Sequence, residues 1–427
     1  MIGAIANPFR IPDLRRRLLF TALMLGLFRL GAHLPVPGVN VEAVRTQFQQ
    51  AAQGTAFGFL NLLVGGALEN FSIFALGVIP YITASIIMSL MQVAFPNLKK
   101  MVQEEGEAGR RRIGWYTLYL TVPLAALQAW GQTGLIQTFS QGRAITDFSP
   151  INMALIIVTL VAGTMMLTWM GEIMTEHGVG NGMSLIIFGG IVARIPQQLA
   201  ATVATIRVGS ASFFWFLTDI VVVLLSIVAV VMITQAVRRI PVQYAKRVVG
   251  RRVMGGQTTH IPMKIVQAGV IPIIFAISVL QFPATVASFV RWEPLVEWGN
   301  RLQPGQHWVG TALYALLIIL FTYFYTSVQF DPNDISDNIK KYGGFIPGIR
   351  PGRPTTEFLM KVTERLTFVG ALFLAVIAVF PLLFFQTAGL TLYLAGTSLL
   401  IVVGVALETM RQLEAYVLMR HYEGFMR

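Results

Sequence analysis

Few side chains in this sequence have the types and spacing that chemistry requires. The five histidines stand far apart, none belongs to an H-E-x-x-H motif, and there is no cysteine. Thiolate catalysis, disulfide bonds and cysteine-based zinc sites are therefore excluded, and the histidine spacing does not suit a metal site. A G-x-x-x-x-G-K-[ST] motif for nucleotide phosphates is also absent. We expect no catalytic residue, no metal site and no cofactor, so the protein is not an enzyme.

Carboxylates inside the apolar segments are also few. Asp219 stands near the start of one apolar run, Glu408 stands late in another, and Glu172 and Glu176 flank the end of a third. A proton- or sodium-coupled transporter normally places carboxylates or broken helices near the membrane midplane. The near absence of such carboxylates argues against a secondary transporter with an inverted five-plus-five repeat, which is kept as the alternative hypothesis. A membrane scaffold without a pore is a third hypothesis.

The composition indicates a polytopic membrane protein. The chain has 427 residues, of which 55% are hydrophobic and only 12% are charged. A soluble globular protein is charged at roughly 25% of its positions, so this chain has too little polar surface for a water-soluble domain. A disordered chain is excluded as well, because disorder requires low hydrophobicity.

Ten apolar runs are long enough to cross a bilayer. The run Leu366–Leu407 has 42 residues without a charge. As one helix it would be about 63 Å long, twice the ~30 Å hydrocarbon core, so it must turn back at Gln386–Thr391. The ten predicted spans are Leu18–Pro35, Phe71–Phe95, Ile113–Gln132, Ile151–Gly171, Asn181–Val203, Phe213–Gln235, Ile265–Val290, Val309–Phe330, Leu366–Gln386 and Thr391–Tyr416.

One apolar segment, residues 57–68, is too short to span. A stretch of about 12 residues is typical of a re-entrant or half helix. Non-helical backbone at membrane depth is tolerated only inside protein or beside a water-filled cavity. The segment therefore predicts a cavity.

Positive charge is distributed unequally between the two faces. If the N-terminus is cytoplasmic, 25 of the 32 Lys and Arg residues lie in cytoplasmic segments. Cytoplasmic loops carry an excess of Lys and Arg, so both termini are predicted to be cytoplasmic. Arg29 lies within the first span and is expected to pair with a polar group inside the bundle.

Two long connections lie on that basic face. Residues 238–264 hold seven Lys or Arg and no acid, and the alternation in Val242–Val253 followed by Gly255-Gly256 predicts a projecting β-hairpin. Residues 331–365 hold repeated Gly and Pro and predict an ordered, turn-rich loop. The excess of basic side chains suits anionic lipid or an RNA-bearing partner.

Six sequence motifs resemble those of the SecY family, the central subunits of bacterial protein-translocating channels. They occur in the family's order between residues 15 and 416. The motifs are GGALENFSIFALGVIPYITASII at 65–87, GVGNGMSLIIFGGIVARIP at 178–196, RRIPVQYAKR and GRR within 238–252, AGVIPIIFA and FPAT within 268–285, DNIKKYGGFIPGIRPG at 337–352, and GTSLLIVVGVALE at 396–408.

The resemblance implies an all-α channel of ten transmembrane helices in two five-helix halves of opposite topology. These halves would be residues 1–204 and 205–427, with a pore between them. The pore would conduct unfolded secretory polypeptides. Its narrowest point would be a ring of aliphatic side chains, which by motif are Ile82, Ile86, Ile187, Ile191, Ile274 and Ile401.

The resemblance also assigns two moving parts. Residues 57–68 would form a plug, with Phe57, Leu60, Leu62, Leu63, Gly65 and Gly66 as its main residues. A lateral gate would lie between spans two and three and spans seven and eight. Through it signal sequences and transmembrane segments would leave into lipid, past Ser278 and Phe282 on span seven. Many relatives have Asn where this chain has Val266, so no polar gate pair is implied.

The resemblance implies several partners. The basic loops would dock the ribosome, including its RNA, and the SecA motor ATPase. SecE and SecG would be membrane partners, an unfolded preprotein the substrate, and a bacterial inner membrane with anionic lipids the location. The docking residues would be Arg238, Arg239, Lys246, Arg247, Arg251, Arg252 and Arg350, of which Arg350 would belong to the motor site.

Overall fold

The computed structural model describes most of the chain. The described residues are 11–51, 61–140, 142–145, 147, 149–207, 213–244, 247–249, 252–254, 258–290, 298, 301–302, 304, 307–388 and 397–425.

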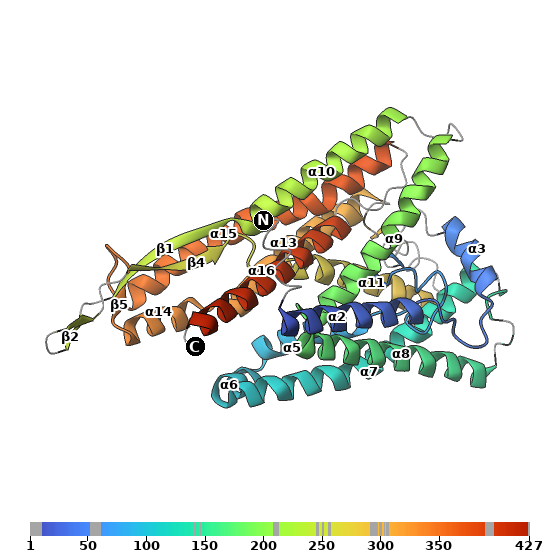
Figure 1. Ribbon diagram of the computed structural model, residues 1–427. Coiled ribbons are helices and arrows are strands. Elements are labelled where there is room, and N and C mark those ends of the chain that lie inside the picture. Colours follow the sequence, from blue (N-terminus) through green and yellow to red (C-terminus); the bar gives the residue numbers. More distant parts are fainter. Residues whose placement is uncertain are drawn as a thin grey trace.

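The protein is predominantly helical, as expected from its apolar runs. Figure 1 shows α2, α5, α7 and α8 side by side and a second group formed by α10, α13, α15 and α16; α9 and α11 connect the two groups, and α11 contacts both α5 and α7. The helices are α2 (Pro12–Gly31), α3 (Val41–Ala51), α5 (Ile79–Ala94), α6 (Pro96–Glu105), α7 (Glu107–Phe139), α8 (Pro150–His177), α9 (Gly182–Arg207), α10 (Phe213–Gln235), α11 (Ile271–Val290), α13 (Trp308–Gln329), α14 (Pro332–Lys341), α15 (Arg353–Ala388) and α16 (Thr397–Phe425).

Local sequence explains where several helices begin. Ser149 caps α8 by accepting a hydrogen bond from the backbone of Asn152 at 3.3 Å, and a proline follows it at the first helical position. Asp331 caps α14 in the same way, with a distance of 3.0 Å to the backbone nitrogen of Asn333. A capping oxygen followed by proline satisfies free amides and presets the first helical turn.

Within the helices, several buried threonine hydroxyl groups are satisfied locally. The side chains of Thr117, Thr121 and Thr168 each donate to the carbonyl four residues earlier, at 2.8 to 2.9 Å. This arrangement needs no water, which suits helices in a bilayer.

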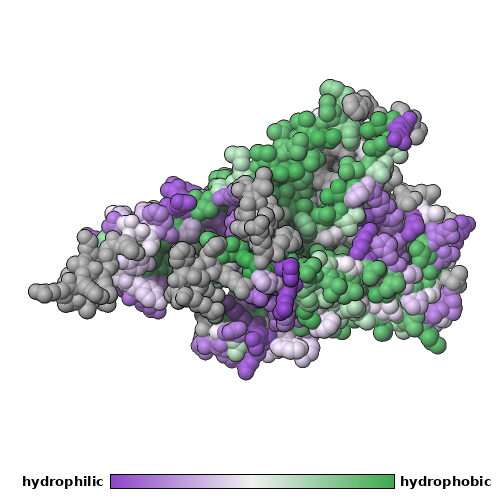
Figure 2. Space-filling view, in the orientation of Figure 1, coloured by the Kyte–Doolittle hydropathy of each residue, from purple (hydrophilic) through white to green (hydrophobic). Residues whose placement is uncertain are grey.

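The hydrophobic surface of the helices is consistent with a lipid environment. Figure 2 shows hydrophobic residues over α10 and its neighbours, and hydrophilic residues at the end that carries the strands. On α10, Phe214 is 70% exposed and Met232 is 67% exposed. Apolar area this large on a helix is typical of lipid-facing surface. The protein is therefore a multi-pass membrane protein.

The structure supports part of the predicted span count. Five described segments are long and apolar enough to cross a membrane, and a sixth is added if the bent pair Ile79–Ala94 and Pro96–Val102 is one span. These two helices meet at 101°. The count of ten therefore remains a prediction. The five segments are Pro150–His177, Gly182–Ala204, Phe216–Gln235, Trp308–Lys341 and Arg353–Phe380.

The predicted second span was wrong in its first third. Helix α5 begins only at Ile79, and residues 71–78 form turns. The backbone amide of Ile73 donates to Leu34, and that of Val36 donates to Phe71. Phe71 and Gly77 have positive φ values of 40° and 58°, which are incompatible with a right-handed helix. Apolar composition alone does not distinguish a buried turn from a helix.

The β-hairpin prediction is confirmed. Strand β1 (Val237–Tyr244) pairs antiparallel with β4 (Thr258–Lys264), and β2 (Arg247–Val249) pairs with β3 (Arg252–Met254). Figure 1 shows the hairpin projecting beyond the helices. The buried side chains of Ile240, Val242 and Met263 pack on one face with residues of α14 and α15.

The second loop is more regular than predicted. Residues 332–341 form the amphipathic helix α14, and β5 (Gly344–Phe345) joins β1 at the edge of the sheet. Helix α15 has begun by Arg353, so turns are confined to residues 342–343 and 346–352, on the two sides of β5. The prediction of a loop throughout residues 331–365 was therefore wrong at both ends.

Candidate functional site

Five of the six isoleucines assigned to the ring belong to one apolar cluster. Ile187, Ile191 and Ile401 are 5%, 0% and 1% exposed. The partly buried Ile82 and Ile274 pack against the same cluster. These side chains come from α5, α9, α11 and α16, so helices far apart in the sequence meet at this point.

The sixth isoleucine, Ile86, lies one helical turn beyond Ile82 on α5 and is 4% exposed. It belongs to a neighbouring cluster formed mainly by α11, α13 and α15, against which Ile82 also packs. Ile82 therefore joins the two clusters.

The described part of the predicted plug packs into the same cluster as the isoleucines. Leu62 and Leu63 are 1% and 7% exposed. Phe57 and Leu60 lie outside the described residues. Residues 61–63 are helical and residues 64–70 form turns, so the helix of the short segment ends at Leu63 instead of continuing to residue 68.

A narrow cavity of about 20 Å³ lies between the plug and the isoleucines. That space is about enough for one water molecule. Its lining is almost entirely apolar and is formed by Phe28, Leu63, Val64, Gly77, Val78, Ile79, Ile82, Ile186, Ile187, Ile274, Ile277 and Ser278.

Ser278 of the predicted lateral gate lines this cavity, and its hydroxyl donates to the carbonyl of Ile274 at 2.8 Å. Its helix, α11, contacts α5 and α7, which are the predicted second and third spans. Phe282 lies in α11, but its side chain is outside the described residues. Val266 is 6% exposed and packs among apolar side chains.

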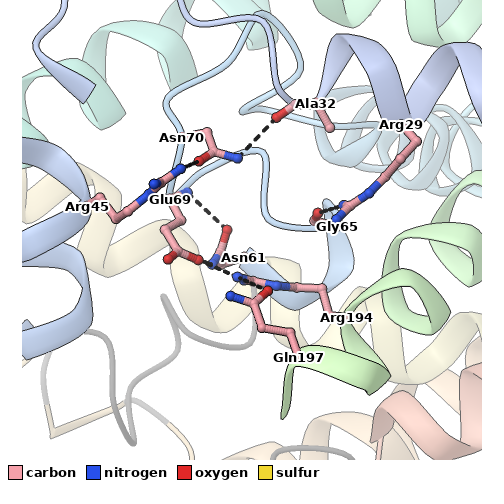
Figure 3. Close-up of polar contacts among 9 residues, drawn as sticks. All are labelled: Arg29, Ala32, Arg45, Asn61, Gly65, Glu69, Asn70, Arg194 and Gln197. Atoms are coloured by element: carbon pink, nitrogen blue, oxygen red, sulfur yellow. Dashed lines mark hydrogen bonds and ion pairs between the residues drawn. The ribbon is translucent and has the colours of Figure 1, made fainter. Parts of the chain in front are cut away.

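Charged groups hold the last part of the plug and the residue that follows it. Figure 3 shows Arg29 of α2 donating to the carbonyl of Gly65, and Arg194 of α9 forming an ion pair with Glu69. The partner expected for Arg29 inside the bundle is therefore confirmed as a backbone carbonyl. Arg194, Glu69 and Asn61 were missed by sequence reasoning. The available signal was a Glu between two apolar runs and an Arg within another.

The predicted docking arginines lie on exposed surface where the structure describes them. Arg238 and Arg239 are exposed on β1, and Arg350 is exposed in the turn after β5. Pairing of β1 with β5, through Gln243 and Phe345, brings the two loops together in one sheet. Arg247 and Arg252 lie in β2 and β3, but their side chains are outside the described residues, as are Lys246 and Arg251 altogether.

Among the residues that the structure describes, no group of three or more His, Asp or Glu side chains is placed to hold a metal ion. Glu408, in the first half of α16, is exposed, and the side chain of Asp219 is outside the described residues.

Comparison with known proteins decides the family. The family model described as SecY matches residues 72–410. The chain belongs to the SecY family. It is 48% identical over 437 residues to the protein translocase subunit SecY of Halalkalibacterium halodurans and 46% identical over 434 residues to that of Bacillus licheniformis; both comparisons cover 100% of each chain.

Solved structures share the fold of this SecY family member. A protein-conducting channel matches 94% of this chain and 92% of its own, with a TM-score of 0.65 and 18% identity. A SecY channel, described as held closed by its plug domain, matches the same shares with a TM-score of 0.64 and 17% identity. Sec61 from the canine ribosome-channel complex matches them with a TM-score of 0.63 and 17% identity.

Proposed function

We propose that this chain is the pore-forming subunit of a protein translocase. It passes unfolded secretory polypeptides across a membrane and releases signal and transmembrane segments laterally into lipid. The family assignment, and the naming of its full-length relatives as translocase subunits, support this activity. The channel itself catalyses no reaction, so a partner supplies the energy.

The observation that carries the proposal is the shared packing of the isoleucines and the plug. Ile187, Ile191 and Ile401 lie in one buried cluster with Leu62 and Leu63. A constriction of aliphatic side chains excludes ions and water by dewetting. Uncharged branched side chains also part for any polypeptide sequence and leave no fixed charge to retain it. In this arrangement the plug and the isoleucines seal the channel together.

Lateral release requires an opening between the two groups of helices. The contacts of α11 with α5 and α7 lie on this path. Ser278 of α11 lies beside this path, where it lines the cavity. The two halves that separate are residues 1–204 and 205–427, divided in the last turn of α9. Separation of α11 from α5 and α7 would expose the cavity to lipid.

The exposed arginines identify the face that receives partners. Arg238 and Arg239 lie on β1, and Arg350 lies in the turn after β5, which pairs with β1 at the projecting end of the molecule. This face is cytoplasmic, as both termini are, and the membrane is the bacterial inner membrane. It docks the SecA ATPase or the ribosome, while SecE and SecG complete the complex within the membrane. Contacts with ribosomal RNA phosphates should weaken as salt rises.

Reconstitution tests the proposal. Vesicles would hold this chain with SecE and SecG, and would receive SecA, ATP and a preprotein with or without its signal sequence. The proposal predicts that the preprotein becomes protected from protease only when ATP and the signal are both present. An assembled complex that protects no preprotein would contradict it.

A further inference from the structure

Besides the exposed contact of Arg45 on α3 with Asn70 at 2.7 Å, two arginines within the helix bundle hold the segment 61–70. Arg29 of α2 donates to the carbonyl of Gly65, and Arg194 of α9 pairs with the carboxylate of Glu69. In Figure 3 both guanidinium groups point toward this segment. These contacts join positions 36 and 125 residues apart in the sequence. The segment is therefore fixed to two helices that adjoin it in space but not along the chain.

Glu69 is held by a second partner from within the segment. Asn61 donates its side-chain amide to a carboxylate oxygen of Glu69 at 3.3 Å, and its carbonyl oxygen accepts from the backbone of Glu69 at 3.0 Å. The side chains of Arg194 and Glu69 are only 13% and 10% exposed. A buried charge is tolerated only when it is paired and hydrogen-bonded. Moving the segment would break such a pair.

Backbone geometry brings Arg194 against the segment at another point. Gly66 has a φ of +89°, and a β-carbon at this position would lie 3.2 Å from the Cζ atom of Arg194. Gly65 has a φ of +66° and approaches the backbone of Gly190 on α9. Two consecutive glycines in the left-handed region allow this close approach. Arg194 thus contacts Gly66 and Glu69 together.

We propose that Arg194 and Arg29 are positioning residues that latch the plug segment in the closed channel, and that the Arg194–Glu69 ion pair must break before the plug leaves. This inference rests on the proposed function, because it concerns a channel with a plug. The latch keeps the channel closed by fixing the position of the plug. The apolar residues Leu62 and Leu63 pack against the isoleucines only while the charged residues after them hold the turn in place.

The charges of the latch predict an order of effects. Glu69 is the acid paired with Arg194, so Glu69→Gln leaves Arg194 without its carboxylate partner. Arg194→Lys keeps a positive charge within reach of Glu69 and should retain most of the latch. A purely structural role for Arg194 would not favour lysine, because lysine lacks the planar fork of donors.

Thiol labelling measures plug opening directly, because the natural chain has no cysteine. In Leu63→Cys the single thiol is buried at the plug. We expect a water-soluble maleimide to label it about tenfold faster when Glu69→Gln is added, which is the effect of losing one charge-assisted contact. Adding Arg194→Gln should also accelerate labelling, whereas adding Arg194→Lys should leave it close to the rate of Leu63→Cys alone.

Matched controls are available on exposed surface. Glu104→Gln on α6 and Arg207→Gln at the end of α9 remove the same charges away from the plug and should leave the labelling rate unchanged. Each variant is measured in the purified complex after a check of assembly. If the complex with Glu69→Gln does not assemble, the labelling rate of the Arg194→Gln variant tests the latch instead. A labelling rate equal to that of the controls in an assembled variant overturns the latch.

The test separates the latch from the proposed function. If the wild-type complex protects no preprotein, the translocase proposal fails, while the labelling rates still report whether the ion pair holds segment 61–70. If the wild-type complex protects preprotein and Glu69→Gln does not accelerate labelling, only the latch fails.

Discussion

Isoleucine side chains are suited to sealing the channel because they are apolar and branched. Ile191 is fully buried on α9 and Ile86 nearly so on α5. Their closing function follows from the absence of charge, since a charged ring would bind ions and substrate segments of opposite sign. The same absence explains why residue types alone do not mark them. Isoleucine in a membrane helix usually packs against a neighbour or faces lipid.

Replacing the two residues tests the seal. Ile86→Gly with Ile191→Gly removes two buried aliphatic side chains and should raise ion conductance across reconstituted vesicles about tenfold, as expected if closure weakens by about 1.4 kcal/mol. Conductance is measured with the complex at rest, without preprotein.

The matched control is Leu90→Gly with Leu199→Gly. These leucines are 42% exposed on the same two helices. The control pair introduces the same helix-weakening glycines, each costing about 1 kcal/mol, without opening the cluster. Equal conductance in the two pairs would contradict the assignment of the ring.

Glycine has a different role in α8. A β-carbon on Gly163 would overlap the carbonyl oxygen of Ile73, so the missing side chain lets α8 pack against the turns of residues 71–78. Gly163→Ala should destabilise the protein by about 1–3 kcal/mol, the usual cost of overpacking. The measurement is the melting temperature of the purified complex.

Gly114→Ala on α7 is the counterpart, because nothing lies within 4 Å of its added β-carbon. Alanine is the better helix former by about 1 kcal/mol, so this variant should melt at or above the wild-type temperature. If Gly163→Ala and Gly114→Ala have the same melting temperature, the close approach of α8 to residues 71–78 is not needed for stability.

At the residue scale, sequence reasoning identified Arg29 as a charge that needs an internal partner, because an arginine in an apolar run is costly unless paired. It did not identify Arg194 as the partner of Glu69. The two lie 125 positions apart. A pair of that separation follows only from the packing of α9 beside the plug, which no local pattern records.

At the scale of elements, the β-hairpin was predicted from the sequence, whereas helix α14, which packs against it, was not. Alternating Val, Tyr and basic residues indicated β1 to β4. Helix α14 has its own signal, since Asp331 and Pro332 form a helix start and Ile335 and Ile339 share one face. The many Gly and Pro residues after Lys341 obscured it and led to the prediction of a loop.

The basic hairpin makes a prediction about salt. If Arg238 and Arg239 contact ribosomal RNA phosphates, the double variant to Gln should weaken ribosome binding and reduce the slope of log affinity against log salt by about 2, close to one per lost contact. Binding is measured by co-sedimentation over a salt series. A slope that stays at the wild-type value would show that these two arginines face solvent or lipid instead.

The turn after β5 makes a prediction about the motor. Arg350→Glu reverses a charge that is exposed on the docking face, and should lower SecA-driven export to below about a tenth of wild type, because like charge opposes docking. Arg207→Glu makes the same reversal at the predicted opposite face and should export normally. An assembled Arg350→Glu complex that exports at the wild-type rate would remove Arg350 from the motor site.

At the scale of the whole molecule, composition and span pattern predicted a polytopic all-α membrane protein, and the fold is shared with protein-conducting channels. The meeting of α5, α9, α11 and α16 around the isoleucines was not predictable from hydropathy, because all of these helices are apolar. It was anticipated only through motifs that resemble the SecY family. The division into two halves stays a prediction that rests on the same resemblance.

Export by the reconstituted complex is the measurement that tests the central proposal most directly. Vesicles contain the wild-type chain with SecE and SecG, and receive SecA, ATP and a signal-bearing preprotein. A channel sealed by isoleucines and a plug predicts protease-protected preprotein that disappears without ATP or without the signal. Equal protection with and without these two, or none from an assembled complex, would contradict it and return attention to an ion-coupled transporter.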